Sequence, residues 1–133
     1  MAETRIPADR LIDFATAVYE REGMPHDDAR LLADTLVQAD LWGHQSHGVL
    51  RLGWYRDRLR NKVMRPSAQI AQIVDAGAMG LIDGHDSVGQ VVTMQATRQA
   101  MQRAKAHGVG VVAVRNSNHF RTSMYYTLLR APG

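Results

Sequence analysis

Between positions 46 and 55 the chain carries three side chains that suit the binding of an organic acid. If a helix begins near Ser46, then His47, Arg51 and Tyr55 lie in a row on one of its faces. A guanidinium holds a carboxylate through two parallel hydrogen bonds, an imidazole exchanges a proton near neutral pH, and a phenol donates a hydrogen bond to an oxygen. Together they suit a molecule with a carboxylate beside a carbonyl. The spacing alone is more typical of an ordinary polar helix face.

A second polar cluster, Asn116-Ser117-Asn118-His119, follows the valine-rich run 109–114. The run predicts a strand that is buried on both faces. Binding sites of open α/β sheets gather at the carboxyl ends of the strands, so His119 is a candidate acid–base group. Asn and Ser are also ordinary turn formers, and a simple turn explains the cluster equally well.

Metal binding and known cofactor motifs have less support. His44 and His47 are three residues apart and allow a metal site with His119 or His85 as a third ligand, but no carboxylate or further histidine completes a familiar spacing. We therefore expect no metal. The glycines at 108 and 110 precede a predicted strand, whereas the dinucleotide fingerprint follows one. These motifs alone do not predict hydride transfer.

Apolar periodicity and turn residues predict the elements that must position these groups. Three N-terminal stretches show helical spacing, a glycine-containing turn between short apolar runs indicates a hairpin, and a long helix and a strand follow. The expected elements are helices ending near Gly23, near Leu41 and over 46–60, strands at 70–74 and 81–83 joined by a turn at 76–80, a helix capped by Ser87 and closed by Gly108, a strand over 109–114, and a helix from about Thr122.

This order predicts a mixed α/β (α+β) protein with N-terminal helices, a β-hairpin and then helix–strand–helix. The loop at 61–67, which contains Pro66, is the expected boundary between an N-terminal helical segment, 1–65, and the start of an α/β core domain, 66–133. A strand buried on both faces needs neighbours, and the hairpin supplies few. We therefore expect the chain to be an incomplete part of a larger fold.

Composition narrows the class of function. With 133 residues, 45% apolar and 22% charged, the chain suits an ordinary globular domain, and the absence of cysteine excludes thiol catalysis and fits a reducing cytoplasm. The net charge of +3 is mild, and the basic residues form no block. No apolar run reaches membrane-spanning length, and the first ten residues lack the apolar core of a signal peptide. We expect a cytoplasmic protein that binds small anions, without nucleic-acid or membrane partners.

Two stretches resemble the signatures of one enzyme family. Residues 46–52 (SHGVLRL), followed by Tyr55, resemble the SHGV-x-R-x-x-x-Y signature of the malate/L-lactate dehydrogenase (type 2) family, and residues 114–120 (VRNSNHF) resemble its SNHFG signature. The hairpin, the turn at 83–86 and the long helix between the two stretches also agree with this family. The resemblance covers nearly the whole chain and is specific, because two motifs and the layout between them match together.

The resemblance implies a non-Rossmann, three-layer α/β/α dehydrogenase, dimeric, that transfers a hydride between NAD or NADP and a small 2-oxo or 2-hydroxy acid. It implies that His119 or His47 exchanges a proton with the substrate oxygen, and it leaves open which of the two does so. Arg51 and Tyr55 would orient the substrate. The implied cofactor contacts are Ser46, His47, Asn118 and Thr122.

The chain departs from the family pattern in two respects. Arg121 stands where the family usually has glycine, and at the entry to a helix it can fill the cofactor site or distort the turn. Family chains are also much longer, and their later part supplies most of the cofactor pocket. We therefore expect a truncated copy with weak or no dehydrogenase activity of its own. The alternative is a catalytically inactive binding or assembly module of the same fold.

Overall fold

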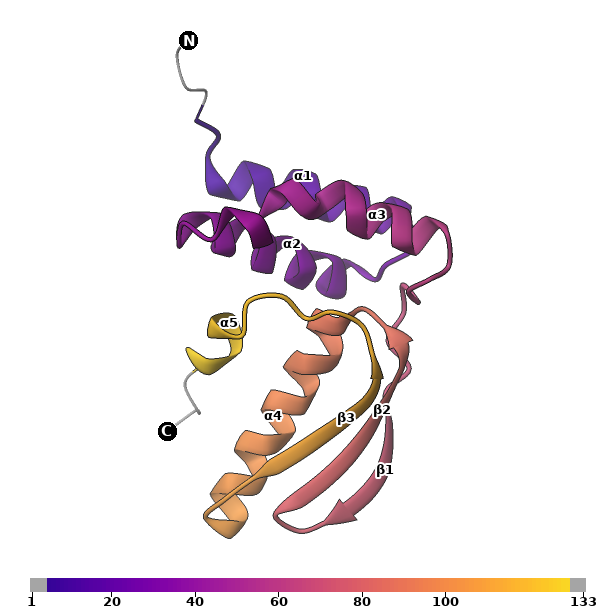
Figure 1. Cartoon of the computed structure of the whole chain (residues 1–133), viewed down its shortest axis with the longest axis vertical. Helices are drawn as coiled ribbons and strands as arrows, with labels where there is room; N and C mark the ends of the chain where they lie inside the picture. The colour runs from indigo at the N-terminus through magenta and orange to yellow at the C-terminus, as the bar shows by residue number, and fades with distance from the viewer. Residues whose placement is uncertain (1–4, 130–133) are drawn as a thin grey trace.

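The structure, a computed structural model, describes residues 5–129. Its elements form two parts, with three helices in one and a three-stranded sheet with a long helix in the other (Figure 1). The helices of the first part are α1 (Ala8–Arg21), α2 (His26–Leu41) and α3 (Leu52–Arg60). The second part holds β1 (Ala71–Ala76), β2 (Met79–Ser87), α4 (Gly89–His107) and β3 (Val111–Ser117), followed by the short α5 (Met124–Thr127).

The helical part has its own apolar core because buried residues recur every three or four positions along each helix. Tyr19 on α1, Leu32 and Leu36 on α2, and Tyr55 and Leu59 on α3 are buried in one cluster. The first two predicted helices are confirmed, with ends close to the expected positions. This core fixes α3 and the turns before it, which carry the first signature.

The third helix begins later than the spacing predicts. Instead of one helix over 46–60, two 3-10 turns, Gln45–His47 and Val49–Arg51, precede α3. Gly48 separates the turns with an extended backbone, and the Val49 N–H donates to the Asp40 carboxylate at 2.8 Å. A Cβ at Gly48 would collide with that carboxylate. The break therefore follows from a tertiary contact with α2, which helical periodicity does not reveal.

The sheet is mixed. β1 and β2 form the predicted hairpin, β3 pairs with β2 in parallel, and the strand order is β1-β2-β3. A parallel pair needs a crossover connection, which α4 supplies. The hairpin turn is tighter than predicted, because β1 continues to Ala76 and β2 starts at Met79 and extends to Ser87. Helices combined with a three-stranded mixed sheet confirm the predicted fold class.

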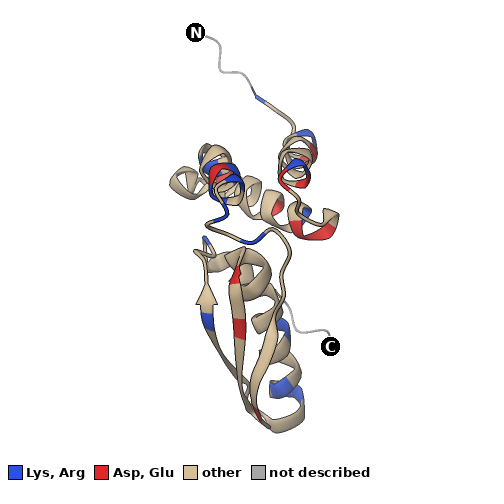
Figure 2. Ribbon diagram, turned by 90° about the vertical axis from the view of Figure 1, so that its right-hand side faces the viewer, with Lys and Arg blue, Asp and Glu red and all other residues tan. Residues whose placement is uncertain are grey.

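The expectation of a strand buried on both faces is wrong for β3. Val111 is 54% exposed and Val114 is 37% exposed. Only one face of the sheet packs on α4, where Ile82 and Val112 belong to a cluster with Val92. Among the described residues β3 is an edge strand, and no element covers the opposite face of the sheet (Figure 2). A valine run shows strand propensity, whereas burial depends on neighbours that the run itself does not name.

The start of α4 also differs from the prediction. Ser87 does not cap the helix, since it lies in β2, and α4 begins at Gly89 without a side-chain cap. A Cβ at Gly89 would collide with the backbone oxygens of Asn118 and His119. A residue without a side chain therefore lets the loop after β3 lie directly against this end of the helix. Gly108, with φ +79°, ends α4 as predicted.

Charge is distributed over several elements. Figure 2 shows Lys and Arg on both parts of the molecule, with acidic residues also present on both.

Across residues 5–129, no helix combines the length and the apolar character that crossing a membrane requires. The division of the chain into domains at residue 65 stays a prediction.

Candidate active site

The two signatures meet in space. His47 ends the first 3-10 turn, and His119 lies in the loop after β3. Their ring centroids are 5.9 Å apart. In the sequence, α3, the hairpin and α4 lie between the two residues. The fold is therefore what brings their rings together. A single small molecule can touch both imidazoles.

The first signature places a hydroxyl and a guanidinium beside His47. Ser46 Oγ is hydrogen-bonded to His47 Nδ1 at 2.9 Å, and the His44 ring stacks on the His47 ring with centroids 4.1 Å apart. Arg51 Nε donates to the Ser46 carbonyl oxygen at 3.1 Å. Among the described residues Arg51 has no carboxylate partner. The remaining edge of its guanidinium can therefore bind an acid.

Tyr55 is buried behind the loop after β3. Its side chain is fully buried, and its hydroxyl accepts a hydrogen bond from Gln90 Nε2 at 2.8 Å. The same hydroxyl donates to the His119 carbonyl oxygen at 3.3 Å. Burial raises the pKa of Tyr55, which keeps the phenol protonated as a donor. The structure thus gives Tyr55 a place from which it positions His119. Gln90, a buried polar residue in the first turn of α4, belongs to no motif and was not predicted from the sequence.

Asn118 and Thr122 hold the same loop. The Asn118 amide donates to the carbonyl oxygens of Asp86 and Ser87 at 2.8 Å and 3.1 Å, and its oxygen accepts from Arg58 Nη2 at 3.0 Å. Thr122 Oγ1 is hydrogen-bonded to His44 Nδ1 at 3.1 Å. These contacts tie the second signature to the end of β2, to α3 and to the turn before His47.

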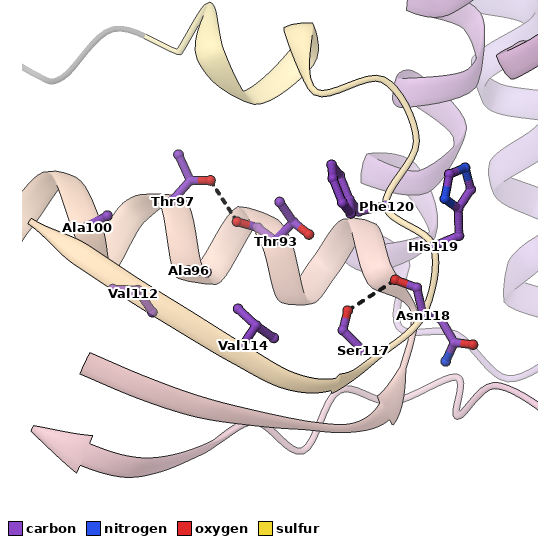
Figure 3. Close-up of a pocket in the computed structure, with 10 residues that line it drawn as sticks. All are labelled: Thr93, Ala96, Thr97, Ala100, Val112, Val114, Ser117, Asn118, His119 and Phe120. Atoms are coloured by element: carbon purple, nitrogen blue, oxygen red, sulfur yellow. Dashed lines mark hydrogen bonds between the residues drawn. The ribbon is translucent and has the colours of Figure 1, made fainter. Parts of the chain in front are cut away.

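Two cavities meet at His119. The smaller, of about 320 Å³, is lined by Ser46, His47, Arg51, Trp54, His119 and Arg121. The larger, of about 660 Å³, lies between α4 and β3. Figure 3 shows its wall of Ala96, Val112 and Val114 with the hydroxyls of Thr93 and Thr97, and His119 at its end. A polar, cationic pocket therefore adjoins a mainly apolar one.

The surroundings favour neutral imidazoles. Burial and then the nearby cations Arg121 and Arg51 lower the pKa of His119. The pKa of His47 is lowered by the same kinds of cause, with burial first, His44 second and Arg121 third. The neutral form of each ring, which is the form that can accept a proton, is therefore favoured. An anion bound in the cavity would offset the cations and raise both pKa values again.

Arg121 is the residue whose place the sequence did not show. Its side chain is only 6% exposed, and its guanidinium lies 4.5 Å from the centroid of the Tyr55 ring. Its backbone has φ +77°, a left-handed conformation that costs a residue with a Cβ about 1–2 kcal/mol. The turn forms despite this strain. The side chain lines the cavity of the two histidines and lies outside the wall of the larger cavity.

Within the described part of the chain, no three His, Cys, Asp or Glu side chains are grouped closely enough to hold an ion. His44 and His47 meet face to face, in a stacked arrangement.

The comparison with known proteins agrees with the resemblance of the two signatures. The profile of the malate/L-lactate dehydrogenase family matches residues 6–131. The chain belongs to this family. It is 41% identical over 127 residues to the malate dehydrogenase of Pyrococcus abyssi (strain GE5 / Orsay), an alignment that covers 96% of this chain and 35% of that enzyme. It is 41% identical over 112 residues to the L-sulfolactate dehydrogenase of Methanocaldococcus jannaschii, which covers 84% of this chain and 33% of that enzyme.

Solved structures of malate/L-lactate dehydrogenases agree. The malate dehydrogenase from Pyrococcus horikoshii OT3 superposes with a TM-score of 0.91 at 41% identity, over 94% of this chain and 36% of that one. The chain thus spans about a third of the length of the family members that it matches. The resemblance of the two signatures to this family is confirmed, and so is the likeness of the fold to part of a larger dehydrogenase.

Proposed function

We propose that this chain forms the acid-binding part of the active site of an NAD(P)-dependent oxidoreductase that acts on small 2-oxo and 2-hydroxy acids. One observation carries the proposal: Arg51, His47 and His119 line a single small cavity. A guanidinium without a carboxylate partner is a site for the substrate carboxylate, and an imidazole within the same cavity can reach the neighbouring oxygen. The names of the similar enzymes, malate and sulfolactate dehydrogenases, fit a substrate of this class.

His119 is the better candidate for the proton exchange. No described residue forms a hydrogen bond with its ring nitrogens, whereas His47 Nδ1 is engaged by Ser46. His119 also lies where the two cavities meet. In oxidation of a 2-hydroxy acid, the hydroxyl proton passes to the neutral His119 ring as the C2 hydrogen leaves with its electron pair. In reduction, the protonated ring returns that proton to the carbonyl oxygen.

The larger cavity fits one end of a nicotinamide cofactor. Its apolar wall suits a flat ring, and its position beside His119 brings that ring next to the acid. Bound there, the nicotinamide would accept or supply the hydride at C2 of the acid. Of the expected cofactor contacts, Asn118 lines this cavity, Ser46 and His47 line the smaller one, and Thr122 lines neither; all four stay proposed contacts. No cationic side chain lines this cavity to meet a diphosphate. The described residues thus fit the reacting end of the cofactor only, and they do not distinguish NAD from NADP.

An inactive acid-binding module is the second candidate. The chain spans about a third of its relatives, and the described residues offer little to hold a diphosphate. Fluorescence titration with NADH separates the two candidates. The oxidoreductase predicts saturable binding, whereas no binding at about millimolar NADH favours the module.

Binding of the acid itself is tested by calorimetric titration with L-malate. The proposal predicts that Arg51→Ala weakens binding by about tenfold or more, the contribution of one bidentate charged contact. Arg65→Ala, which removes an exposed arginine outside this cavity, is the matched control and should bind as the wild type does. Equal affinities for the wild type and Arg51→Ala would contradict the proposal.

A cytoplasmic location and a homodimer are also proposed. The absence of cysteine supports the first, and the family resemblance supports the second. Light scattering after gel filtration checks the dimer, and a mass equal to one chain of 14.8 kDa would contradict it.

A further inference from the structure

Arg121 is a buried cation without an acidic partner. Its side chain is 6% exposed, and its Nε and Nη2 atoms are buried with no hydrogen-bond partner in the described structure. Nor does any described carboxylate form an ion pair with it. Guanidinium groups stay charged in proteins, and a buried charge without a partner is strongly unfavourable. No described residue therefore supplies the negative group that would neutralise this cation.

The position of Arg121 shows where that group would bind. The residue lines the same cavity of about 320 Å³ as Arg51, Ser46 and the two histidines. Among the described residues, the charged or titratable groups that line this cavity are two guanidinia and two imidazoles, without a carboxylate. His44, behind His47, adds a third imidazole, and the Tyr55 ring supports the Arg121 guanidinium from one side. A cavity of this size and charge suits a small molecule with more than one negative group.

We propose that Arg121 is a specificity-determining residue that binds the second anionic group of a dianionic 2-oxo or 2-hydroxy acid, while Arg51 binds the carboxylate beside the reacting carbon. This inference rests on the proposed function and narrows its substrate class to acids with an anionic group at both ends. It also explains why a left-handed position that favours glycine carries an arginine here.

A purely structural role would not require the charge. Packing against the Tyr55 ring can be provided by an uncharged side chain of similar length, with no unpaired nitrogens left in the interior. Nor does Arg121 line the larger cavity, so the structure does not place it across the proposed nicotinamide site.

Two ligands that differ only at the far end test the inference. L-malate carries a second carboxylate where (S)-2-hydroxybutanoate carries a methyl group. Calorimetric titration of the full chain should show that wild type prefers L-malate by about tenfold or more, as expected for one charged bidentate contact. Arg121→Gln and Arg121→Gly should reduce that preference to about one by weakening L-malate binding alone. Arg65→Gln, which removes one exposed positive charge elsewhere, should keep the wild-type preference.

Each outcome bears on a different claim. If both Arg121 variants keep the preference for L-malate, or lose affinity for both acids equally, the inference is overturned while the proposed function stands. If wild type binds neither acid, or if Arg51→Ala binds both as well as wild type, the proposed function fails and the inference fails with it. Arg121→Gly relieves the backbone strain and so guards against misfolding, which circular dichroism of each variant checks.

Discussion

The Tyr55 hydroxyl joins Gln90 to the backbone of His119, accepting a hydrogen bond from one and donating to the other. This relationship links the two parts of the molecule at the site. Tyr55 belongs to α3 in the helical part, Gln90 to α4, and His119 to the loop after β3. A phenol that is not among the lining residues of the cavity thus holds the backbone of the histidine that is.

Removing this hydroxyl should destabilise the protein and loosen the loop. Tyr55→Phe leaves the fully buried Gln90 amide without its partner, and we expect a loss of about 1–3 kcal/mol in the free energy of unfolding. Urea denaturation measures it. Tyr19→Phe is the matched control, because the buried Tyr19 hydroxyl has no partner among the described residues and its removal should be neutral or stabilising. A Tyr55→Phe variant as stable as wild type would show that the link contributes little.

The contact between α4 and the loop should not tolerate a side chain. Gly89→Ala places a Cβ against the backbone oxygens of Asn118 and His119, and such overpacking costs about 1–3 kcal/mol. Gly53→Ala in α3 meets no neighbouring atom and should stabilise the helix by about 0.5–1 kcal/mol. Thermal unfolding should therefore shift in opposite directions for the two variants. A shift in the same direction would count against the close approach of loop and helix.

The histidines should titrate below their usual range. Burial and the adjacent arginines lower the pKa of His119, so its ring should be mostly neutral at pH 7 and gain its proton at a pH below about 6.5. Because the folded protein disfavours the protonated ring, the free energy of unfolding is unaffected by His119 above this unfolded-state pKa. It decreases as the pH falls below that value and the ring becomes protonated. Arg121→Gln removes a positive neighbour and should raise the pKa, whereas Arg65→Gln should not. NMR titration of the ring protons measures this, and an unchanged midpoint in Arg121→Gln would contradict the assignment.

Asp83 should make the fold sensitive to acid. The carboxylate is buried and accepts hydrogen bonds from the His85 N–H at 2.8 Å, from Arg115 Nε at 2.7 Å and from the Asn116 amide. The His85 N–H contributes most, and together these donors lower the pKa of Asp83 to about 2. The resulting stabilisation is complete above about pH 4, the unfolded-state pKa, and is lost as the pH falls towards 2.

Asp83→Asn checks this prediction. The variant should be less stable at neutral pH, and the difference from wild type should shrink between about pH 4 and pH 2. Asp57→Asn, which changes an exposed acid, should leave the pH dependence of unfolding unchanged. A constant difference between Asp83→Asn and wild type across this range would show that the carboxylate charge is not what matters.

Much of the fold follows from local pattern. The helices α1, α2 and α4 and the hairpin were predicted because apolar spacing and glycine positions specify them locally. The break at Gly48 was not, because it depends on the Asp40 carboxylate of another helix. The exposure of β3 was missed for a similar reason: valines indicate a strand, but only the neighbouring elements determine its burial.

The site shows the same limit. The resemblance of two short motifs was enough to name His47, Arg51 and His119, and the structure places all three on one cavity. The two motifs did not reveal that the Tyr55 hydroxyl is hydrogen-bonded to Gln90, or that the Arg121 side chain lines the cavity. Both depend on the approach of α3, α4 and the loop after β3, which are far apart in sequence.

The central claim is that one small acid contacts both histidines while Arg51 binds its carboxylate. NMR spectra of the histidine rings during titration with L-malate test it most directly. We expect the signals of His47 and His119 to shift together with one dissociation constant, and Arg51→Ala to raise this constant by about tenfold or more. Signals that move with different constants, or a constant that Arg51→Ala leaves unchanged, would contradict it.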